Sequence, residues 1–125
     1  MDNLEHFDIC VGRVFKILLE NFPLKSDIVV SDLILEKNTT GLDKIYYHSI
    51  LYLEELELIK IETKTISPSA FLGVRLSAKG LSVLRATPKS IQSKESLADR
   101  ILNFSHKTNN EILKNTISYI FELIK

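Results

Sequence analysis

Hydrophobic side chains recur every three or four positions near the start of the chain. The repeating positions are Phe7, Val11, Val14, Leu18 and Phe22. This spacing is typical of an amphipathic helix that buries one side, so we predict a helix over about residues 4–21. It should end before Pro23, because proline disfavours helical geometry in the residue that precedes it. Cys10 lies within the apolar stripe and is expected to fill space in the core.

Two shorter helices are predicted after this proline. Two serine–aspartate pairs offer oxygens that can cap the first of them, and both starts remain open: Ser26 with Asp27, or Ser31 with Asp32. This helix should end near Lys37, before a polar turn over residues 38–41. Asp43 can cap a third helix that reaches about residue 56. Its inward positions would be Tyr46, Ile50, Leu53 and Leu56.

The period of the hydrophobic pattern changes to two after the third helix. Isoleucine and threonine alternate with charged residues from Ile59 to Thr65, which predicts a half-exposed strand over residues 58–66. A turn at residues 67–69 leads to a second strand over residues 71–76. Its inward face would carry Leu72, Val74 and Leu76. A two-stranded hairpin is marginally stable by itself, so we expect this one to pack on the helices.

Three more helical patterns complete the chain. Ser77 can cap a helix that runs to about Arg85, before Pro88 interrupts it. Two tail helices follow, separated by a polar turn over residues 107–110. Their apolar stripes are Leu97, Ile101 and Phe104 in the first, and Leu113, Ile117, Ile120 and Ile124 in the second.

The last helix has an apolar arc that is wider than a helix on a small core usually requires. Ile112, Phe121 and Leu123 add to its stripe. We therefore expect residues 91–125 to form a helical hairpin that makes a homodimer. The alternative is that the helix over residues 4–21 covers this arc within one chain.

Composition excludes several classes of protein. A chain of 125 residues with 45% hydrophobic and 26% charged residues is typical of one globular domain. We find no basic and apolar leader at the start and no apolar run of about 18 residues, so we expect a cytoplasmic protein that does not enter a membrane. A single cysteine cannot form an intramolecular disulfide.

Charge is distributed unevenly although the net charge is zero. Residues 1–57 carry a net charge of −6, and residues 58–94 carry +6. The basic stretch contains Lys60, Lys64, Arg75, Lys79, Arg85, Lys89 and Lys94. Such a stretch can attract phosphates or an acidic protein, or it can simply form a solvated surface.

The sequence has no pattern that is typical of catalysis or of cofactor binding. His6, His48 and His106 lie on separate predicted elements without a second ligand at helical spacing, so we expect no metal. The four glycines are isolated, which is unlike a phosphate-binding loop. The acids Glu54, Glu55 and Glu57 at the end of a helix are expected to be surface residues. We therefore predict that the protein is not an enzyme and has no cofactor.

The predicted elements are two helices, a turn, a third helix and a basic hairpin, in this order. This is the arrangement of a winged helix-turn-helix domain. The segment IYYHSILYLEELELIKI (residues 45–61) resembles the recognition helix and first wing strand of winged-helix families. RLSAKGLSVL (residues 75–84) resembles the entry from their second wing strand into the next helix. The similarity covers about residues 7–86, and it is strongest to small, uncharacterised winged-helix proteins of bacteria and prophages.

This resemblance implies a mainly helical α+β fold. Residues 1–90 would form a winged helix-turn-helix domain with a two-stranded wing, followed by the helical hairpin of residues 91–125. Winged-helix proteins often have glycine between the recognition helix and the strand, because a left-handed residue ends the helix there. This chain has Glu57 instead, and a non-glycine residue in that conformation costs about 1 to 2 kcal/mol.

The resemblance further implies a transcriptional regulator that binds double-stranded DNA. In the family, the third helix enters the major groove and the wing contacts the backbone or the minor groove. The corresponding candidates here are Lys44, Tyr47 and His48 on the helix, and Lys60, Lys64 and Arg75 on the wing. The wing cations would displace counterions from phosphates.

A protein partner is the alternative to DNA. The exposed face of the third helix has one full positive charge, no arginine or asparagine suited to reading a base, and the apolar Leu51. Tyrosines with an aliphatic neighbour are typical of protein-binding surfaces. A small neutral protein of this kind could be an immunity protein or antitoxin that neutralises a toxin by direct contact.

Overall fold

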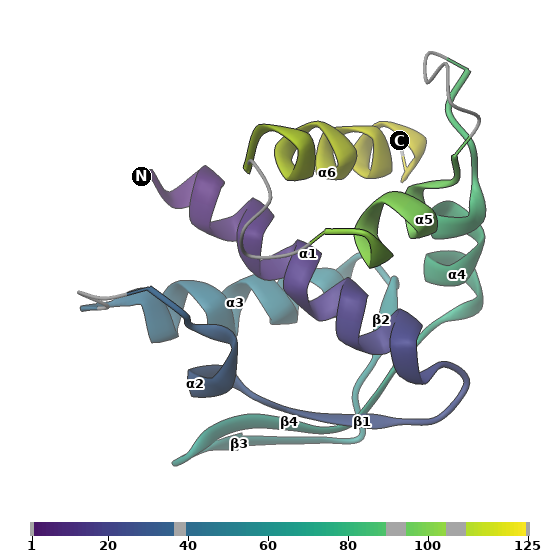
Figure 1. Ribbon diagram of the computed structural model, residues 1–125. Helices are drawn as coiled ribbons and strands as arrows, with labels where there is room; N and C mark the ends of the chain where they lie inside the picture. Colours follow the sequence, from purple (N-terminus) through teal and green to yellow (C-terminus); the bar gives the residue numbers. More distant parts are fainter. Residues whose placement is uncertain (1, 37–39, 90–94, 105–109, 125) are drawn as a thin grey trace.

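The computed structural model describes residues 2–36, 40–89, 95–104 and 110–124. It is a mixed fold of helices and a small antiparallel sheet (Figure 1), which confirms the predicted α+β class. In chain order, the elements are α1 (Asn3–Asn21), β1 (Ser26–Val29), α2 (Val30–Leu33), α3 (Leu42–Glu55), β2 (Ile59–Lys60), β3 (Thr63–Ile66), β4 (Ser69–Leu76), α4 (Ala78–Arg85), α5 (Leu97–Leu102) and α6 (Asn110–Ile124).

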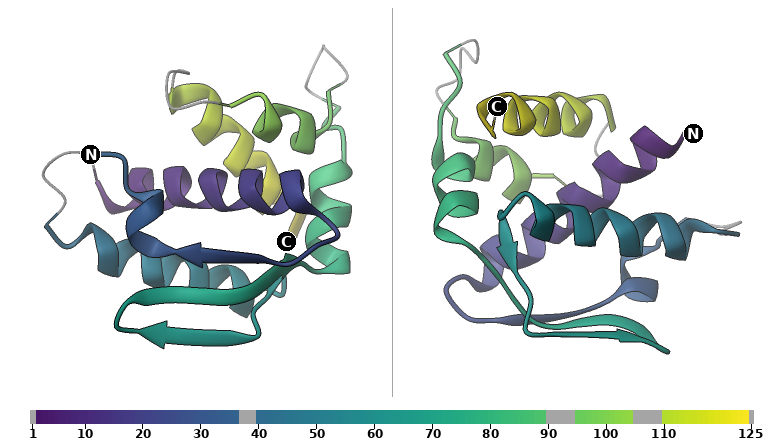
Figure 2. Two further views of the ribbon diagram at one scale, coloured as in Figure 1. Left: turned by 60° about the horizontal axis from the view of Figure 1, so that its bottom comes forward. Right: turned by 180° about the vertical axis from the view of Figure 1, so that it is seen from behind.

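Helix α1 runs through the middle of the molecule. It has α3 and the sheet on one side and α5 and α6 on the other (Figures 1 and 2). The Asp2 side chain caps it by accepting a 2.9 Å hydrogen bond from the Glu5 backbone N–H. Its bounds confirm the prediction from the apolar stripe, and Val11, Val14 and Leu18 are buried as expected.

Residues 26–29 form a strand, so the prediction of a helix that starts at Ser26 and Asp27 was wrong. The β-branched Ile28 and Val29 pair with Phe71 and Ala70 of β4, and such residues pack well on a sheet. Helix α2 follows with only four residues and no side-chain cap. Neither predicted serine–aspartate pair caps it. The Asp27 carboxylate instead accepts a 2.9 Å hydrogen bond from the Gly73 backbone N–H.

Strand β4 is the centre of the sheet. It pairs antiparallel with β1 on one edge and with β2 and β3 on the other. The predicted hairpin is therefore present, but it belongs to a sheet of four strands. The predicted strand over residues 58–66 is divided, because Ile61 and Glu62 separate β2 from β3.

The inward face of β4 differs from the prediction. Phe71, Val74 and Leu76 are buried, whereas Leu72 is only half-buried. The reason is a bulge: Gly73 has a φ of 65°, and the pairing with β1 shifts its register at this point. The alternation of inward and outward side chains that predicted Leu72 as a core residue holds only after Gly73, where Val74 and Leu76 are buried.

Helix α3 buries the predicted residues Tyr46, Ile50 and Leu53 completely. Leu56 lies beyond its end and is only partly buried. The helix begins after Gly41, whose φ is 81°, and Asp43 lies in its first turn without capping it. The predicted turn is only partly visible, because residues 37–39 lie outside the described part of the chain.

Helix α4 begins as predicted. The Ser77 hydroxyl accepts a 3.0 Å hydrogen bond from the Gly80 backbone N–H. In the tail, Ser96 and Asp99 form a capping box at the start of α5. Most of the predicted turn before α6 lies outside the described residues.

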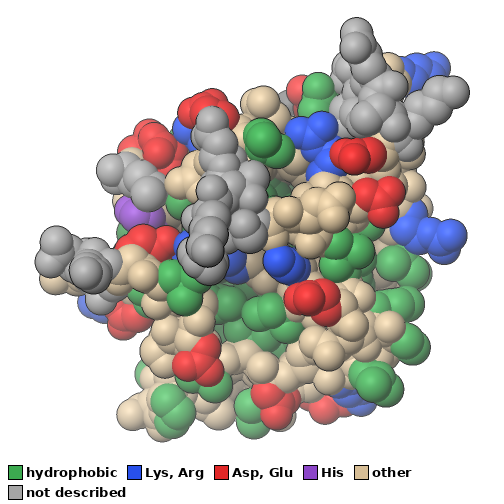
Figure 3. Space-filling view, in the orientation of Figure 1, with side chains coloured by type: hydrophobic (Ala, Val, Ile, Leu, Met, Phe, Trp, Pro, Cys, Tyr) green, Lys and Arg blue, Asp and Glu red, His purple; other side chains and the backbone are tan. Residues whose placement is uncertain are grey.

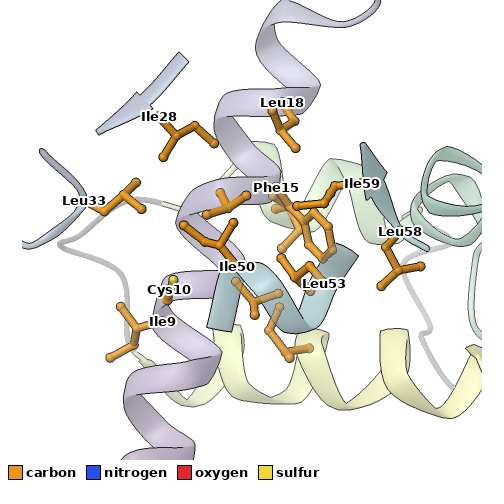
Figure 4. Close-up of a cluster of buried hydrophobic side chains, with 14 of the residues drawn as sticks. Ile9, Cys10, Phe15, Leu18, Ile28, Leu33, Ile50, Leu53, Leu58 and Ile59 are labelled. Atoms are coloured by element: carbon orange, nitrogen blue, oxygen red, sulfur yellow. The ribbon is translucent and has the colours of Figure 1, made fainter. Parts of the chain in front are cut away.

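The stripe of α6 packs on α1 of the same chain. Leu113, Ile117 and Ile120 are buried in the core that α1, α3 and the sheet also form. Figure 4 shows the centre of this core, where side chains of α1, β1, α3 and β2 meet. Intramolecular packing, the alternative that the sequence left open, thus covers most of the apolar arc. Ile112 and Leu123 are each 48% exposed.

A polar cluster connects α1 to the segment after α2. The Arg13 guanidinium donates hydrogen bonds to both Glu36 carboxylate oxygens, at 2.8 and 3.2 Å, and to the Tyr46 hydroxyl at 3.1 Å. Burial by itself would raise the pKa of Glu36, but hydrogen bonds from Arg13 and from the backbone, together with the charge of Arg13, outweigh it and hold this pKa below its usual value. The cluster joins α1 and α3 to the segment after α2.

Candidate binding surfaces

The outer face of α3 consists of Lys44, His48, Leu51 and Glu55. These residues are spaced by four, three and four positions, so they lie on one side of the helix, opposite the buried Tyr46, Ser49 and Leu53. Lys44, His48 and Glu55 are exposed, and Leu51 is half-buried. The structure therefore presents two of the three predicted DNA-contacting residues of this helix to solvent.

Tyr47, the third candidate on this helix, has a packing role. It is half-buried, and its ring lies against the ring of Phe71 from β4, with centroids 4.7 Å apart. The ring of His48 meets it edge-on at 5.7 Å. Tyr47 thus braces α3 against the sheet and helps to fix the position of His48.

Lys64 on β3 is paired with an acid of α3. Its ammonium group lies 2.7 Å from a carboxylate oxygen of Glu54. Lys64 pairs across the sheet with Phe71, and directly opposite residues share a face. Its side chain therefore lies on the same face as the Phe71 side chain, which contacts α3. The ion pair connects the hairpin to the helix and neutralises one of the predicted wing charges.

Lys60 and Arg75 lie side by side at the base of the hairpin. They are direct partners across β2 and β4. Lys60 is exposed, and the half-buried Arg75 guanidinium makes only a long hydrogen bond of 3.4 Å to the Leu76 carbonyl. Within the described residues, neither side chain is part of an ion pair. These two cations are close together near the C-terminal end of α3, whereas Lys44 lies at its other end.

Acids lie close to one of these cations, Lys60. Glu54 and Glu57 share a hollow of about 580 Å³ with Lys60 and Lys79. The positive charge that the sequence shows for residues 58–94 is therefore interrupted in space by acids from residues 54–57. The sequence predicts these acids to be surface residues, but it does not show that they border one of the candidate cations.

An apolar groove of about 690 Å³ lies between α1, α3 and α6. Its main apolar residues are Phe7, Ile45, Tyr52, Leu56, Phe121 and Ile124. Phe7 lies at the centre of an aromatic cluster, 5.9 Å from Tyr52 and 5.5 Å from Phe121 between ring centroids. Leu4 at its edge is 73% exposed. The groove is thus an accessible surface with apolar walls from three helices.

A smaller hollow of about 430 Å³ continues from this groove along α3. It shares His48 and Tyr52 with the groove and adds Leu51, Glu54 and Glu55. Tyr52 is 45% exposed at the junction of the two. The apolar groove and the outer face of α3 therefore form one continuous surface.

The groove is not predictable from the sequence. The repeat that places Phe7 in the stripe of α1, and the wide arc that includes Phe121 in α6, were both visible. The contact between the Phe7 and Phe121 rings depends on how α6 crosses α1. The spacing of apolar residues along the chain does not specify this crossing. Phe121 and Ile112 also belong to different surroundings, because Ile112 lines a hollow with Arg100 and Phe104 near α5. Phe121 and Ile112 thus line separate hollows, and the homodimer through residues 91–125 stays a prediction.

The described residues contain no cluster of three His, Cys, Asp or Glu side chains that could hold a metal ion. Cys10 is buried, and burial raises the pKa of its thiol, so the reactive thiolate is disfavoured.

The face shown in Figure 3 mixes acidic, basic and hydrophobic side chains. Among the described residues, no helix combines the length and the apolar composition that a membrane span requires.

Comparisons of the chain with protein-family models, with curated proteins and with solved structures found no match.

Proposed function

We propose that this chain is a winged-helix protein that binds double-stranded DNA through α3 and the base of the hairpin. The observation that carries the proposal is the outer face of α3, which presents Lys44 and His48. Beside it, Lys60 and Arg75 are direct partners across β2 and β4 at the base of the hairpin. An exposed helix face can enter the major groove, and the cations of an adjacent hairpin can reach the DNA backbone.

The order of the elements supports the winged-helix assignment. Helices α1, α2 and α3 are followed by the antiparallel pair β3 and β4, and then by α4. Glu57, at the point where the family often has glycine, has a left-handed φ of 63°. The local geometry is thus the one that the resemblance implies, even though glycine is absent.

The ion pairs determine how strong this binding should be. Lys44, Lys60 and Arg75 are available for phosphates, whereas Lys64 is paired with Glu54. Three phosphate contacts correspond to a slope of about −2.7 in a plot of log affinity against log salt concentration. We therefore expect weak binding that decreases steeply between about 50 and 200 mM salt.

Fluorescence anisotropy with a labelled duplex over this salt range tests the proposal. Lys60→Ala and Arg75→Ala should each reduce the slope by about one, and Lys64→Ala should change it less. Lys89→Ala is the matched control, because it removes an exposed cation that belongs to neither α3 nor the hairpin. Absence of duplex binding at about 50 mM salt would contradict the proposal.

Binding of a protein partner is the second candidate, and the apolar groove is the observation that favours it. Accessible apolar surfaces of this kind commonly mark protein-binding sites. An immunity protein or antitoxin would use the groove to hold its toxin. The test is formation of a stoichiometric complex with the product of the neighbouring gene. Leu4→Glu should abolish that complex without unfolding the chain, because Leu4 is 73% exposed.

A further inference from the structure

The outer face of α3 has opposite charges at its two ends. Lys44 lies in the first turn of the helix and Glu55 at its last position. Among the described residues, neither side chain takes part in an ion pair or a side-chain hydrogen bond. Between them, His48 is exposed and Leu51 is half-buried.

The spacing of these residues is that of a helix-pairing seam. Steps of four, three and four positions keep side chains along one line of a helix, as in the contacts between two packed helices. The midpoint between Lys44 and Glu55 is also the midpoint between His48 and Leu51. A two-fold axis at this midpoint would therefore place each residue opposite the other member of its pair in a second copy.

We propose that the outer face of α3 docks on the same face of a second copy of this chain, as an antiparallel helix pair. Lys44 of each copy then lies against Glu55 of the other, and His48 lies against Leu51. The contact is self-complementary, as a two-fold interface requires. A parallel arrangement would place Lys44 against Lys44 and Glu55 against Glu55, so the charges select the antiparallel one.

Apolar contact at the centre supplies the attraction that exposed charges lack. The hollow of about 430 Å³ next to Leu51 and Tyr52 lies on this face and can receive side chains of the second copy. Tyr52 is 45% exposed in the single chain, and burial of its ring would contribute to the association. The charged pairs at the ends then mainly determine orientation, because exposed ion pairs are individually weak.

This inference is independent of the proposed DNA binding, but it uses the same helix face. A second copy on α3 would cover Lys44 and His48, so duplex DNA and the second copy should compete. The two proposals also differ in what they require of Glu55. This acid attracts the second copy, whereas it repels phosphates.

Sedimentation analysis of the full chain from about 10 μM to about 1 mM tests the dimer. K44E and E55K should each weaken the association about tenfold or more, because two attractive pairs become repulsive. An equimolar mixture of the two variants should associate again. The K44E chain presents two acids and the E55K chain two bases, so the mixed dimer has an opposite charge at both contacts.

Charge reversals elsewhere provide the controls. E20K on α1 and K89E beyond α4 make the same changes in net charge at exposed positions, and they should leave the association unchanged. A native chain that remains monomeric over the whole range would overturn the inference. So would a dimer that K44E and E55K do not weaken, or variants that do not associate when mixed. E55K should strengthen DNA binding, whereas K44E should weaken it. Because both substitutions weaken the dimer, measurements of DNA binding and of association show separately which of the two proposals fails.

Discussion

Glu57 shows how one residue can carry strain that the surrounding structure imposes. Its left-handed φ of 63° ends α3 and allows two backbone hydrogen bonds that close the last turn. The Leu58 N–H donates to the Leu53 carbonyl at 3.0 Å, and the Glu57 N–H donates to the Glu54 carbonyl at 2.9 Å. The Ser77 hydroxyl also donates a 2.5 Å hydrogen bond to the Glu57 carbonyl. These bonds hold Glu57 in a conformation that glycine adopts without a penalty.

Glu57→Gly should therefore stabilise the chain by about 1 kcal/mol, since it removes the steric cost of a side chain in the left-handed region. Urea denaturation followed by circular dichroism measures this change. Glu55→Gly is the matched control, because Glu55 is the last helical residue of α3. There, glycine should destabilise the chain by up to about 1 kcal/mol. A Glu57→Gly chain no more stable than the native one would show that the position is not strained.

At the scale of elements, the sequence predicted those whose pattern is local. The apolar stripes of α1 and α3 and the serine cap of α4 each lie within one segment, so periodicity was sufficient. Strand β1 was missed because a short apolar run such as Ile28 to Val30 is compatible with helix or strand until its partner is known. The bulge at Gly73 likewise depends on the pairing with β1.

The candidate sites depended even more on contacts between distant segments. The sequence identified Lys44 and His48 as exposed residues of α3 and Lys60 as an exposed residue of the hairpin. It did not show that Glu54 would neutralise Lys64, because this contact joins α3 to β3. The apolar groove was not predictable either, since its walls come from three helices that are far apart in sequence.

The contact between α4 and Leu58, which lies between α3 and β2, is close enough to exclude a side chain at Gly80. A Cβ atom there would overlap the backbone carbonyl oxygen of Leu58, which cannot move away without shifting the chain. At Gly12, a Cβ would instead meet the end of the flexible Leu113 side chain. The two glycines thus mark close approaches with different capacity to adjust.

Gly80→Ala should destabilise the chain by about 3 kcal/mol, at the upper end of the usual cost of overpacking, and Gly12→Ala by about 1 kcal/mol. Thermal denaturation of the two variants beside the native chain measures the difference. Both substitutions add the same methyl group within a helix, so each controls for the other. Equal losses, or a larger loss at Gly12, would contradict the geometry of the α4 contact.

At the scale of the whole molecule, the tail belongs to the same core as the rest of the chain. The buried side chains of α5 and α6 include Leu97, Ile101, Leu113, Ile117 and Ile120. They pack in one cluster with those of α1. Burial of five such side chains contributes roughly 10 kcal/mol, at about 1.5 to 3 kcal/mol each. This amount is similar to the entire stability of a typical domain, about 5 to 15 kcal/mol.

A chain that ends at residue 90 should therefore lose cooperative folding, because its α1 would expose the surface that α5 and α6 cover. We expect a broad thermal transition and binding of a hydrophobic dye, where the full chain gives one sharp transition. Leu113→Ala in the full chain is the graded comparison, with an expected loss of about 2 to 5 kcal/mol and retained cooperativity. A truncated chain with a sharp transition and no dye binding would mean that residues 1–90 fold independently and that the tail is an addition to a complete core.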